Sequence, residues 1–249
     1  MKAKYISLNL FLCFAALFSS LKAEENFTAW QFSLNIQTGT DIGGAVPYPL
    51  KNIPSPFNAY PQLRPMLGGV LSMNLVDNFA LAAELNYKRI QMNADARVEN
   101  QRFKMDASSM YFTGTAKMEM DFTMLEIPLY VKYQFSKGVN RILLGGYYSR
   151  VLSGKFITIP TKGFAAEEPD FVDLEDMSGV VMDFSTDLDK WDVGAIIGYE
   201  RKLIDRLNLG IHFSMGFKDV FKPSADYFDY NMLHMRGSIK IAYQLFDLK

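Results

Sequence analysis

The chain has 249 residues, of which 49% are hydrophobic, and its 26 basic side chains nearly balance its 27 acidic ones. This balance argues against a nucleic acid as partner, because binding to phosphates needs an excess of basic side chains. After residue 23, no stretch reaches the roughly 18 consecutive apolar residues that a membrane-spanning helix requires.

Residues 1–23 have the order of a secretory signal peptide. Lys2 and Lys4 precede the apolar run Leu10–Phe18, and a cut is expected after Ala23. Removing the three lysines of this segment from the 26 basic side chains leaves 23 against 27 acidic ones, a net charge of about −4. Cys13 leaves with it. The expected mature chain, 24–249, is therefore one domain without disulfides, thiolate metal sites or cysteine nucleophiles.

The first predicted strand, 30–37, alternates between two kinds of side chain. Its apolar face carries Trp30, Phe32, Leu34 and Ile36, and its polar face carries Gln31, Ser33, Asn35 and Gln37. Lipid outside and water inside a barrel is the simplest reading of this period-2 pattern. Residues 42–64 then hold five of the ten prolines. Because proline cannot donate to a sheet ladder, this segment is expected to be a long loop.

The next three predicted strands are 65–75, 79–88 and 125–135. Glu84 and Lys88 mark the inner face of the second of these, since a charge facing lipid at mid-membrane costs about 2–4 kcal/mol. Glu126 and Lys132 mark the inner face of the third, where Pro128 predicts a bulge or bend. Residues 91–123, between the predicted strands 79–88 and 125–135, form a polar, methionine-rich connection. Its part 117–122 still alternates, which would let the two strands project beyond the membrane.

A fifth strand is predicted at 141–152, with Tyr148 inward and Tyr147 outward because Arg150 is taken to face the lumen. Residues 153–189 follow as the longest insertion. From Gly163 to Asp189 this insertion contains nine acidic and no basic residues. A solvated acidic loop is favoured over a divalent cation site, because the spacing of a calcium-binding loop is missing.

Three strands complete the pattern at 191–199, 207–217 and 233–245. The second alternates without a break over LNLGIHFSMGF, and the others place Asp192, Glu200, Arg236 and Lys240 on their inner faces. Long connections follow strands one, three, five and seven, and short ones follow two, four and six. This asymmetry predicts an antiparallel up-and-down transmembrane barrel of eight strands, with long extracellular loops, periplasmic turns and periplasmic termini. Hidden strands at 117–122 or 156–159 would raise the count to ten.

Four segments carry a resemblance to a known family: TMLEIPLYVKYQF at 123–135, LLGGYYSRVLSG at 143–154, WDVGAIIGYERKL at 191–203 and LNLGIHFSMGFKDVF at 207–221. Over essentially the whole mature chain, the sequence resembles the outer-membrane β-barrel family of Bacteroidetes often labelled PorT-like. The resemblance implies a barrel without a catalytic signature. The namesake of the family is associated with type IX secretion and gliding, which suggests a secretion-related role by analogy.

The interior of an eight-stranded barrel is about wide enough for side chains to fill it. The inward charges are therefore expected to pair across the lumen as a structural network: Glu84, Lys88, Glu126, Lys132, Asp192, Glu200, Arg236 and Lys240. No cofactor or metal site is expected. The expected partners are outer-membrane lipid and lipopolysaccharide, the barrel-assembly machinery, and an unknown protein bound through the extracellular loops.

The main hypothesis is a non-enzymatic structural, assembly or adhesion component. A small channel or transporter is the first alternative. The second is a lipid- or peptide-hydrolysing enzyme with its site at the outer rim, which needs a histidine and a carboxylate there. Of the two histidines, His212 and His234, only His234 is predicted close enough to the rim to meet Asp187 or Asp189.

Overall fold

The computed structural model describes residues 31–76, 78–105, 108–167, 174–225 and 227–248. The expected signal peptide, 1–23, and Trp30 lie outside these residues. The eight long strands are β1 (Phe32–Tyr48), β3 (Pro65–Val76), β4 (Phe79–Met105), β5 (Ser108–Phe135), β6 (Asn140–Ala166), β9 (Trp191–Ile204), β10 (Leu207–Asp219) and β11 (Asn231–Leu248). The short elements are β2 (Phe57–Gln62), β7 (Glu175–Asp176), β8 (Met182–Asp183) and the 3-10 turns η1 (Leu50–Asn52) and η2 (Ser185–Asp187). In this part of the chain, no helix is long and apolar enough to cross a membrane.

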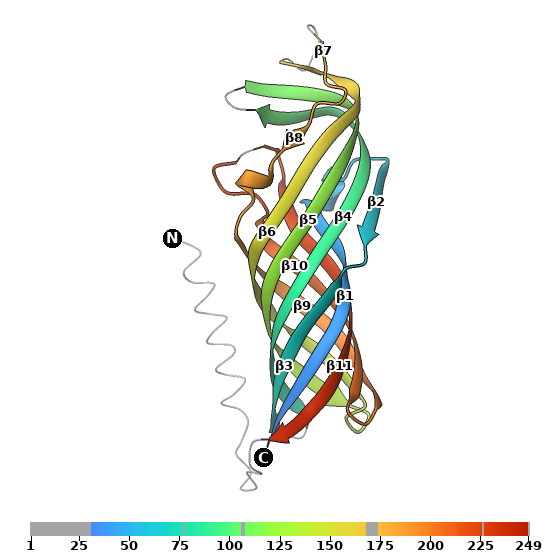
Figure 1. The fold of residues 1–249 in the computed structure, drawn as a ribbon, viewed down its shortest axis with the longest axis vertical. Helices are drawn as coiled ribbons and strands as arrows, with labels where there is room; N and C mark the ends of the chain where they lie inside the picture. The colour runs from blue at the N-terminus through green and yellow to red at the C-terminus, as the bar shows by residue number, and fades with distance from the viewer. Residues whose placement is uncertain (1–30, 77, 106–107, 168–173, 226, 249) are drawn as a thin grey trace. The chain divides into compact units, whose positions relative to one another are not determined.

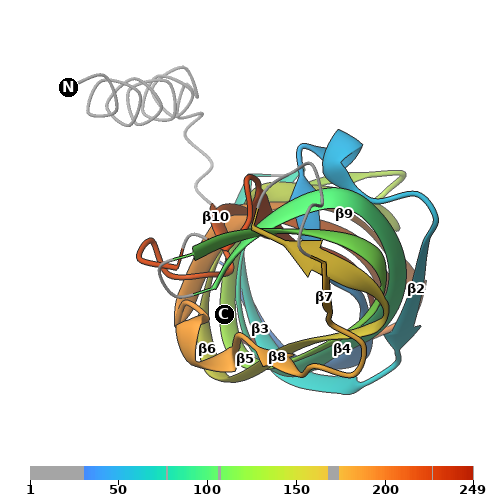
Figure 2. The same ribbon diagram turned by 90° about the horizontal axis from the view of Figure 1, so that it is seen from above.

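The long strands form a closed antiparallel ring (Figures 1 and 2). Each pairs with the next in the order β1, β3, β4, β5, β6, β9, β10, β11, and β11 pairs with β1 from Phe32↔Leu248 to Tyr48↔Asn231. β2 adds to β4, while β7 and β8 add to β6. The predicted all-β barrel is thus confirmed, with eight strands in the ring and three short strands outside that count.

Connection lengths distinguish the two ends of the barrel. At the turn end, only a few residues separate β3 from β4, β5 from β6 and β9 from β10. In the turn between β5 and β6, Ser136, Lys137 and Gly138 all have positive φ, at 53°, 58° and 79°. The long connections lie at the opposite end, here called the loop end. Phe32, where β1 begins, and Leu248, where β11 ends, are paired with each other at the turn end.

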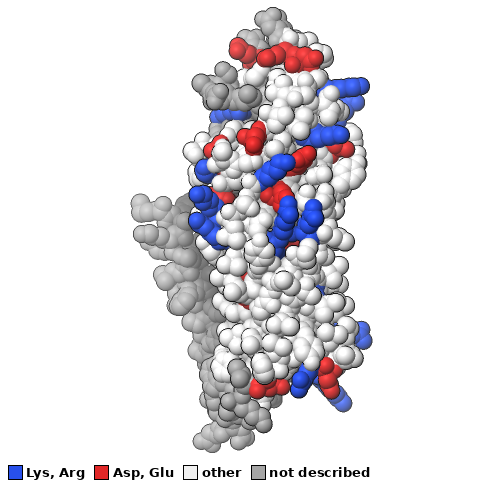
Figure 3. Space-filling model, in the orientation of Figure 1, with Lys and Arg blue, Asp and Glu red and all other residues white. Residues whose placement is uncertain are grey.

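An apolar belt surrounds the barrel next to the turn end. On β4, the outward positions from Phe79 to Tyr87 are apolar or aromatic, and Leu85 and Tyr87 are 52% and 55% exposed. Arg89 then begins a charged zone. The belt spans the roughly 9–11 residues that a tilted strand needs to cross a bilayer. Figure 3 shows this uncharged surface between charged zones above and below it.

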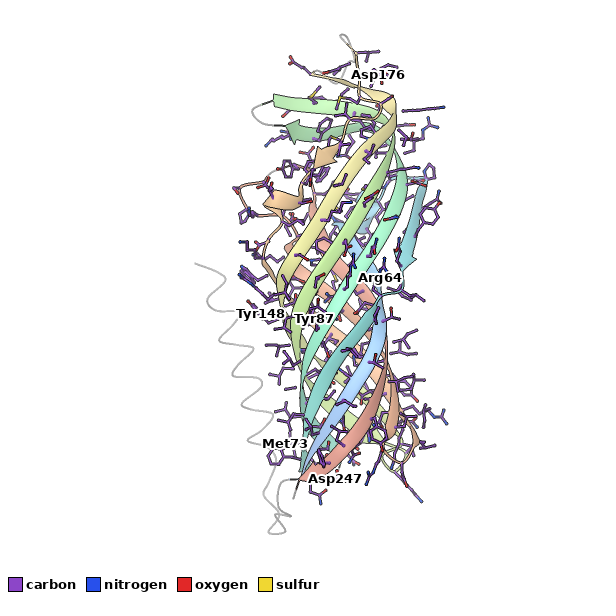
Figure 4. All side chains as sticks on the ribbon, in the orientation of Figure 1. Arg64, Met73, Tyr87, Tyr148, Asp176 and Asp247 are labelled. Carbon is purple, nitrogen blue, oxygen red and sulfur yellow. The ribbon has the colours of Figure 1, made fainter. Side chains whose placement is uncertain are left out.

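Aromatic side chains border the belt on both sides, as the interfacial girdles of membrane barrels do. Exposed rings at the turn end are Phe79, Tyr133, Tyr199 and Tyr243, and those at the loop-end border are Tyr87, Tyr148, Trp191 and Phe217. In Figure 4, Tyr87 and Tyr148 lie at a similar height on the outer surface, far from Asp176 at the loop end.

The prediction of a proline-rich loop at 42–64 was wrong in two places. Residues 42–48 continue β1, and 57–62 form β2. Pro47 pairs with Met232, and Pro61 pairs with Met92. Each proline lies where its strand has only one partner, because β3 ends opposite Thr40 and β2 pairs with β4 alone. A free edge tolerates proline, since the missing N–H is not needed there.

β4 and β5 project beyond the belt, as the alternation at 117–122 indicated, and together with β6 they run further than their predicted bounds. β4 continues through 105, β5 begins at 108, and β6 continues to 166, so most of 91–123 and the start of 153–189 are sheet. Their inward side chains in this extension are apolar and buried, among them Ile90, Met92, Met120, Phe122 and Phe156. Burial of this apolar face explains why a segment that reads as polar overall forms strands.

One side-chain orientation was predicted wrongly, and the irregularity predicted at Pro128 is an interruption of the ladder. Tyr147, not Tyr148, faces the lumen, while Tyr148 is 43% exposed and stacks on Trp191 at 6.5 Å. The error arose from Arg150, which faces outward because it already lies beyond the belt, beside Trp191. At Pro128 the ladder between β4 and β5 lapses for two pairs, but the register is the same on both sides and no bulge forms.

The belt predicts a position-dependent cost for an outward charge. Phe213 on β10 and Phe164 near the end of β6 are similarly exposed, at 46% and 49%. Phe213→Arg should destabilise the folded barrel by about 2–4 kcal/mol, because the charge then faces hydrocarbon. Phe164→Arg should leave it folded. Heat-modifiable mobility of the refolded proteins measures the difference, and an equal loss for both variants would contradict the placement of the belt.

Candidate functional site

The interior of the barrel is arranged in layers along its axis. The layer nearest the turn end is ionic: Lys132 on β5 donates to Glu200 on β9 at 2.8 Å. Arg141 on β6 lies 3.8 Å from the same carboxylate and donates to Asn208 on β10 at 2.9 Å. The two neighbouring hairpins β5–β6 and β9–β10 are thereby joined at their inner faces.

A small apolar layer follows, formed by Val70, Ala82, Tyr130, Leu143 and Ile196. These residues come from β3, β4, β5, β6 and β9 and are at most 2% exposed. The ring of Tyr130 lies 5.4 Å from Lys132 Nζ, so its face supports the cation below. Its hydroxyl points to the other side and donates to Glu84.

Glu84 is the centre of the next layer. Its carboxylate accepts hydrogen bonds from Lys240 Nζ at 2.7 Å, Gln37 Nε2 at 2.8 Å and Asn86 Nδ2 at 2.7 Å, in addition to Tyr130. These donors come from β11, β1, β4 and β5, so one side chain connects strands on different sides of the ring. A buried carboxylate needs such partners, because it has lost its hydration.

A further ionic layer lies above it. Glu126 accepts from Lys88 at 2.7 Å and from Arg236 at 2.6 Å, and Lys88 also lies 3.3 Å from Asp41. Ser238 donates to Asp41 as well. The guanidinium of Arg236 lies over the ring of Tyr147 at 4.9 Å, and Tyr147 donates to Asp192 at 2.6 Å.

An apolar plug closes the barrel above the ionic layers. Between Glu126 and the loop end, the inward side chains of β5 are Met124, Phe122 and Met120, and those of β4 beyond Lys88 are Ile90 and Met92. Phe156, Phe184, Leu188, Val220, Phe221 and Met232 complete the same cluster from β6, β11 and the loops. Rings of Phe156, Phe184 and Phe221 meet at centroid distances of 5.1–6.2 Å.

All eight inward charges named from the sequence lie in the lumen, each at most 8% exposed: Glu84, Lys88, Glu126, Lys132, Asp192, Glu200, Arg236 and Lys240. Seven of them form ion pairs with one another, whereas Asp192 accepts a hydrogen bond from the neutral side chain of Tyr147. Sequence reasoning missed Asp41, because the first strand was ended too early. Continuing the alternation through Asn35, Gln37 and Gly39 places Asp41 on the same inner face.

Neither histidine makes a hydrogen bond with a carboxylate of the described residues. His234 is 2% exposed with its ring edge against Phe122, at a centroid distance of 4.9 Å. The two acids expected near it have other partners, since Asp187 accepts from Tyr227 and Asp189 from Lys218. His212 Nε2 lies 3.8 Å from Glu200, beyond hydrogen-bonding distance.

The acidic insertion is held by local hydrogen bonds in its described part. The backbone N–H of Ser178 donates to Asp176, and that of Ser185 donates to Asp183, both at 2.9 Å. Hydrogen bonding from the side chains of Ser178 and Ser185, together with these backbone bonds, lowers the pKa of both aspartates. Among the described residues, no group of three or more potential ligands could hold a metal ion. Asp170 and Asp173 lie outside the described residues.

The buried ion pair Lys240–Glu84 can be compared with an exposed one of equal length. Lys240→Met leaves Glu84 buried without its cation and should destabilise the barrel by about 3–5 kcal/mol. Lys155→Met removes an exposed pair with Glu119, also at 2.7 Å, and should change stability little. Urea unfolding in lipid vesicles measures both. In the double variant Glu84→Gln/Lys240→Met, most of the loss should be recovered, and no recovery would contradict an electrostatic origin.

Comparison with known proteins agrees with this architecture. A family model described as outer membrane protein beta-barrel domain matches residues 5–222. No curated protein matches the sequence. Similar solved structures include Ail, the attachment invasion locus protein of Yersinia pestis, at 8% identity over 88% of this chain and 100% of Ail, with a TM-score of 0.40. Another is OprG from Pseudomonas aeruginosa, at 13% identity over 87% of this chain and 95% of OprG, with a TM-score of 0.32.

The family match covers far more than half of the sequence, and the ring, apolar belt and aromatic borders are those of a membrane barrel. The chain therefore belongs to the outer membrane protein beta-barrel domain family, whose members reside in the outer membrane.

Proposed function

We propose that the protein is a non-enzymatic outer-membrane barrel with a filled lumen, which carries a rigid platform of strands and loops on the cell surface. In this role it acts as a structural, assembly or adhesion component. The proposal rests on the layers of side chains that fill the lumen. Along the barrel axis these are the Lys132–Glu200 pair, the contacts of Glu84, the contacts of Arg236 and the plug at Phe122.

The filled interior favours this function over that of a channel. A conducting pore needs a continuous hydrated path, whereas here the ionic side chains are paired with each other and covered by apolar ones. Pairs such as Lys88–Asp41 and Arg236–Glu126 cross the lumen between strands that are not neighbours. Passage of a solute would require both sets of contacts to break.

The platform is formed by the parts of β4, β5 and β6 beyond the apolar belt. β4 and β5 remain paired to Met105↔Ser108, and β5 and β6 remain paired to Tyr111↔Ala166. Loops brace it from the other wall: Phe103 bridges to Phe228, and Arg102 donates to Asp229 at 2.6 Å. Such a framework presents its loops in fixed positions, which suits recognition of a partner protein or of lipopolysaccharide.

The orientation follows from the asymmetry of the connections. In outer-membrane barrels, long connections are extracellular and short turns are periplasmic. We therefore place the loop end outside the cell and both termini in the periplasm. A PorT-like, secretion-associated role, as the sequence resemblance implies, uses the same orientation, with the platform as the docking surface for secreted or surface proteins.

Conductance distinguishes a filled barrel from a channel. The purified protein, inserted in planar bilayers, should show no large stable openings because ion pairs and the plug occupy the lumen. A general porin measured in the same bilayers supplies the positive control. Large openings of constant size in most insertions would overturn the filled lumen and support the channel function.

Single cysteines can test the orientation, since Cys13 is the only cysteine in the sequence. On intact cells, a membrane-impermeant maleimide should label Ser178→Cys at the loop end. Asp205→Cys, in the exposed turn between β9 and β10, should be labelled only after the outer membrane is permeabilised. The unchanged chain is the background control. The reverse pattern would show that the barrel is inserted the other way round.

A further inference from the structure

An open recess lies in the wall of the barrel, where β6 loses its second partner strand. β6 pairs with β9 as far as Arg150↔Trp191 and with β8 only from Ile157, so the residues between them have no strand on that side. The segment that leads into β9 borders this gap, and its Ser185 accepts a hydrogen bond from the backbone N–H of Phe156 at 3.0 Å. The recess has a volume of about 420 Å³, within the range of about 300–1,000 Å³ that ligand sites occupy.

Two positive charges in the lining of the recess are not compensated. Arg150 and Lys190 are both exposed and make no ion pair with the described residues. The one acid in the lining, Asp189, is already bound to Lys218 and accepts a hydrogen bond from the backbone N–H of Trp191 at 3.3 Å. The recess therefore favours an anion.

Hydroxyl groups stand beside the two cations. Ser153, Ser185 and Thr186 belong to the lining, and each hydroxyl can donate one hydrogen bond. A guanidinium such as that of Arg150 binds phosphate oxygens through two parallel N–H bonds, and an ammonium binds them as a point charge. Because a phosphate group has more charge and more acceptor oxygens than a carboxylate, it uses more of these donors.

The recess lies at the depth where lipid headgroups meet the protein. Arg150 pairs with Trp191, which belongs to the aromatic border of the belt and stacks on Tyr148 at 6.5 Å. Leu152 in the lining is 56% exposed, so apolar surface adjoins the two cations. Figure 3 shows basic side chains gathered just above the uncharged belt. A basic side chain near a membrane surface strengthens binding to anionic lipid by about fivefold.

We propose that this recess binds the phosphate group of an anionic lipid in the leaflet at the loop end, with Arg150 and Lys190 as the cationic partners. Trp191 and Leu152 offer apolar surface to the rest of the lipid, which a soluble phosphate would not use. The inference deepens the proposed recognition of lipopolysaccharide, and it rests on the proposed orientation, which places the phosphates of lipopolysaccharide in this leaflet.

Trp191 provides a reporter at the site. The sequence has two tryptophans, so Trp30→Phe leaves Trp191 as the only one. This barrel is placed in phosphatidylcholine nanodiscs that contain phosphatidic acid brominated near the headgroup, because bromine quenches the fluorescence of a nearby indole. Quenching should exceed that by brominated phosphatidylcholine at the same mole fraction, since the lipid with the phosphomonoester gathers at the recess. Equal quenching by the two lipids would overturn the proposal.

Two pairs of exposed cations distinguish a site from general attraction by charge. Arg150→Gln/Lys190→Gln should weaken the binding of phosphatidic acid by about fivefold for each cation removed. Lys117→Gln/Lys162→Gln lowers the charge equally, on β5 and β6 farther from the belt, and should preserve the binding. Heat-modifiable mobility checks that each barrel is folded, and the single variants replace a double variant that is not. Undiminished binding in the folded first variant, or equal loss in both, would overturn the site.

Competing ligands identify the group that is recognised. Lipid A with its phosphates should displace the brominated phosphatidic acid, and lipid A without them should not. Equal displacement by both forms would overturn the role of the phosphate, and displacement by inorganic phosphate at the same concentration would overturn a lipid as its source. These measurements use the purified barrel, so they are independent of the conductance and cysteine-labelling experiments that test the proposed function.

Discussion

The structure depends on one constraint: inside a bilayer, every backbone N–H and C=O must find its partner within the protein. The pairing of β11 with β1 meets this requirement for the two strands that would otherwise be edges. Once the ring is closed, each strand presents one face to lipid and one to the interior. The belt from Phe79 to Tyr87 and the inward carboxylate of Glu84 are two results of the same alternation.

Closure with eight strands also decides what the interior can be. The space is about the width that side chains fill, so charges brought inward must pair with each other. Glu84 and Glu126 each accept bonds from strands on more than one side of the ring. Beyond the belt, water surrounds the outer face, and the interior can become apolar, as it does from Phe122 upward. The interior is therefore ionic where lipid surrounds the barrel wall and apolar where water surrounds it.

The sequence was sufficient to predict the ring, because a period-2 alternation, clearest in LNLGIHFSMGF, recurs eight times along the chain. It also placed Lys88 and Arg236 on the inner face. It was insufficient beyond the belt: there the outward face meets water and the inward face is apolar, so the pattern is the reverse of that in the membrane between 91 and 123. Pro47 and Pro61 led to the prediction of a loop, because the sequence of one strand does not reveal whether one of its edges is unpaired. The plug combines residues from distant segments, such as Phe156 and Met232, which local patterns do not relate.

The connections made by Glu84 have a consequence for assembly in the membrane. Its donors Gln37, Tyr130 and Lys240 belong to the first, a middle and the last strand of the chain. A hairpin of β3 and β4 that entered lipid alone would carry Glu84 and Lys88 without these partners, at the cost of burying bare charges. Stepwise insertion of hairpins is therefore unfavourable. The strands must come together while their inner faces are still hydrated, and the chain can leave water only when its last strand has joined the first.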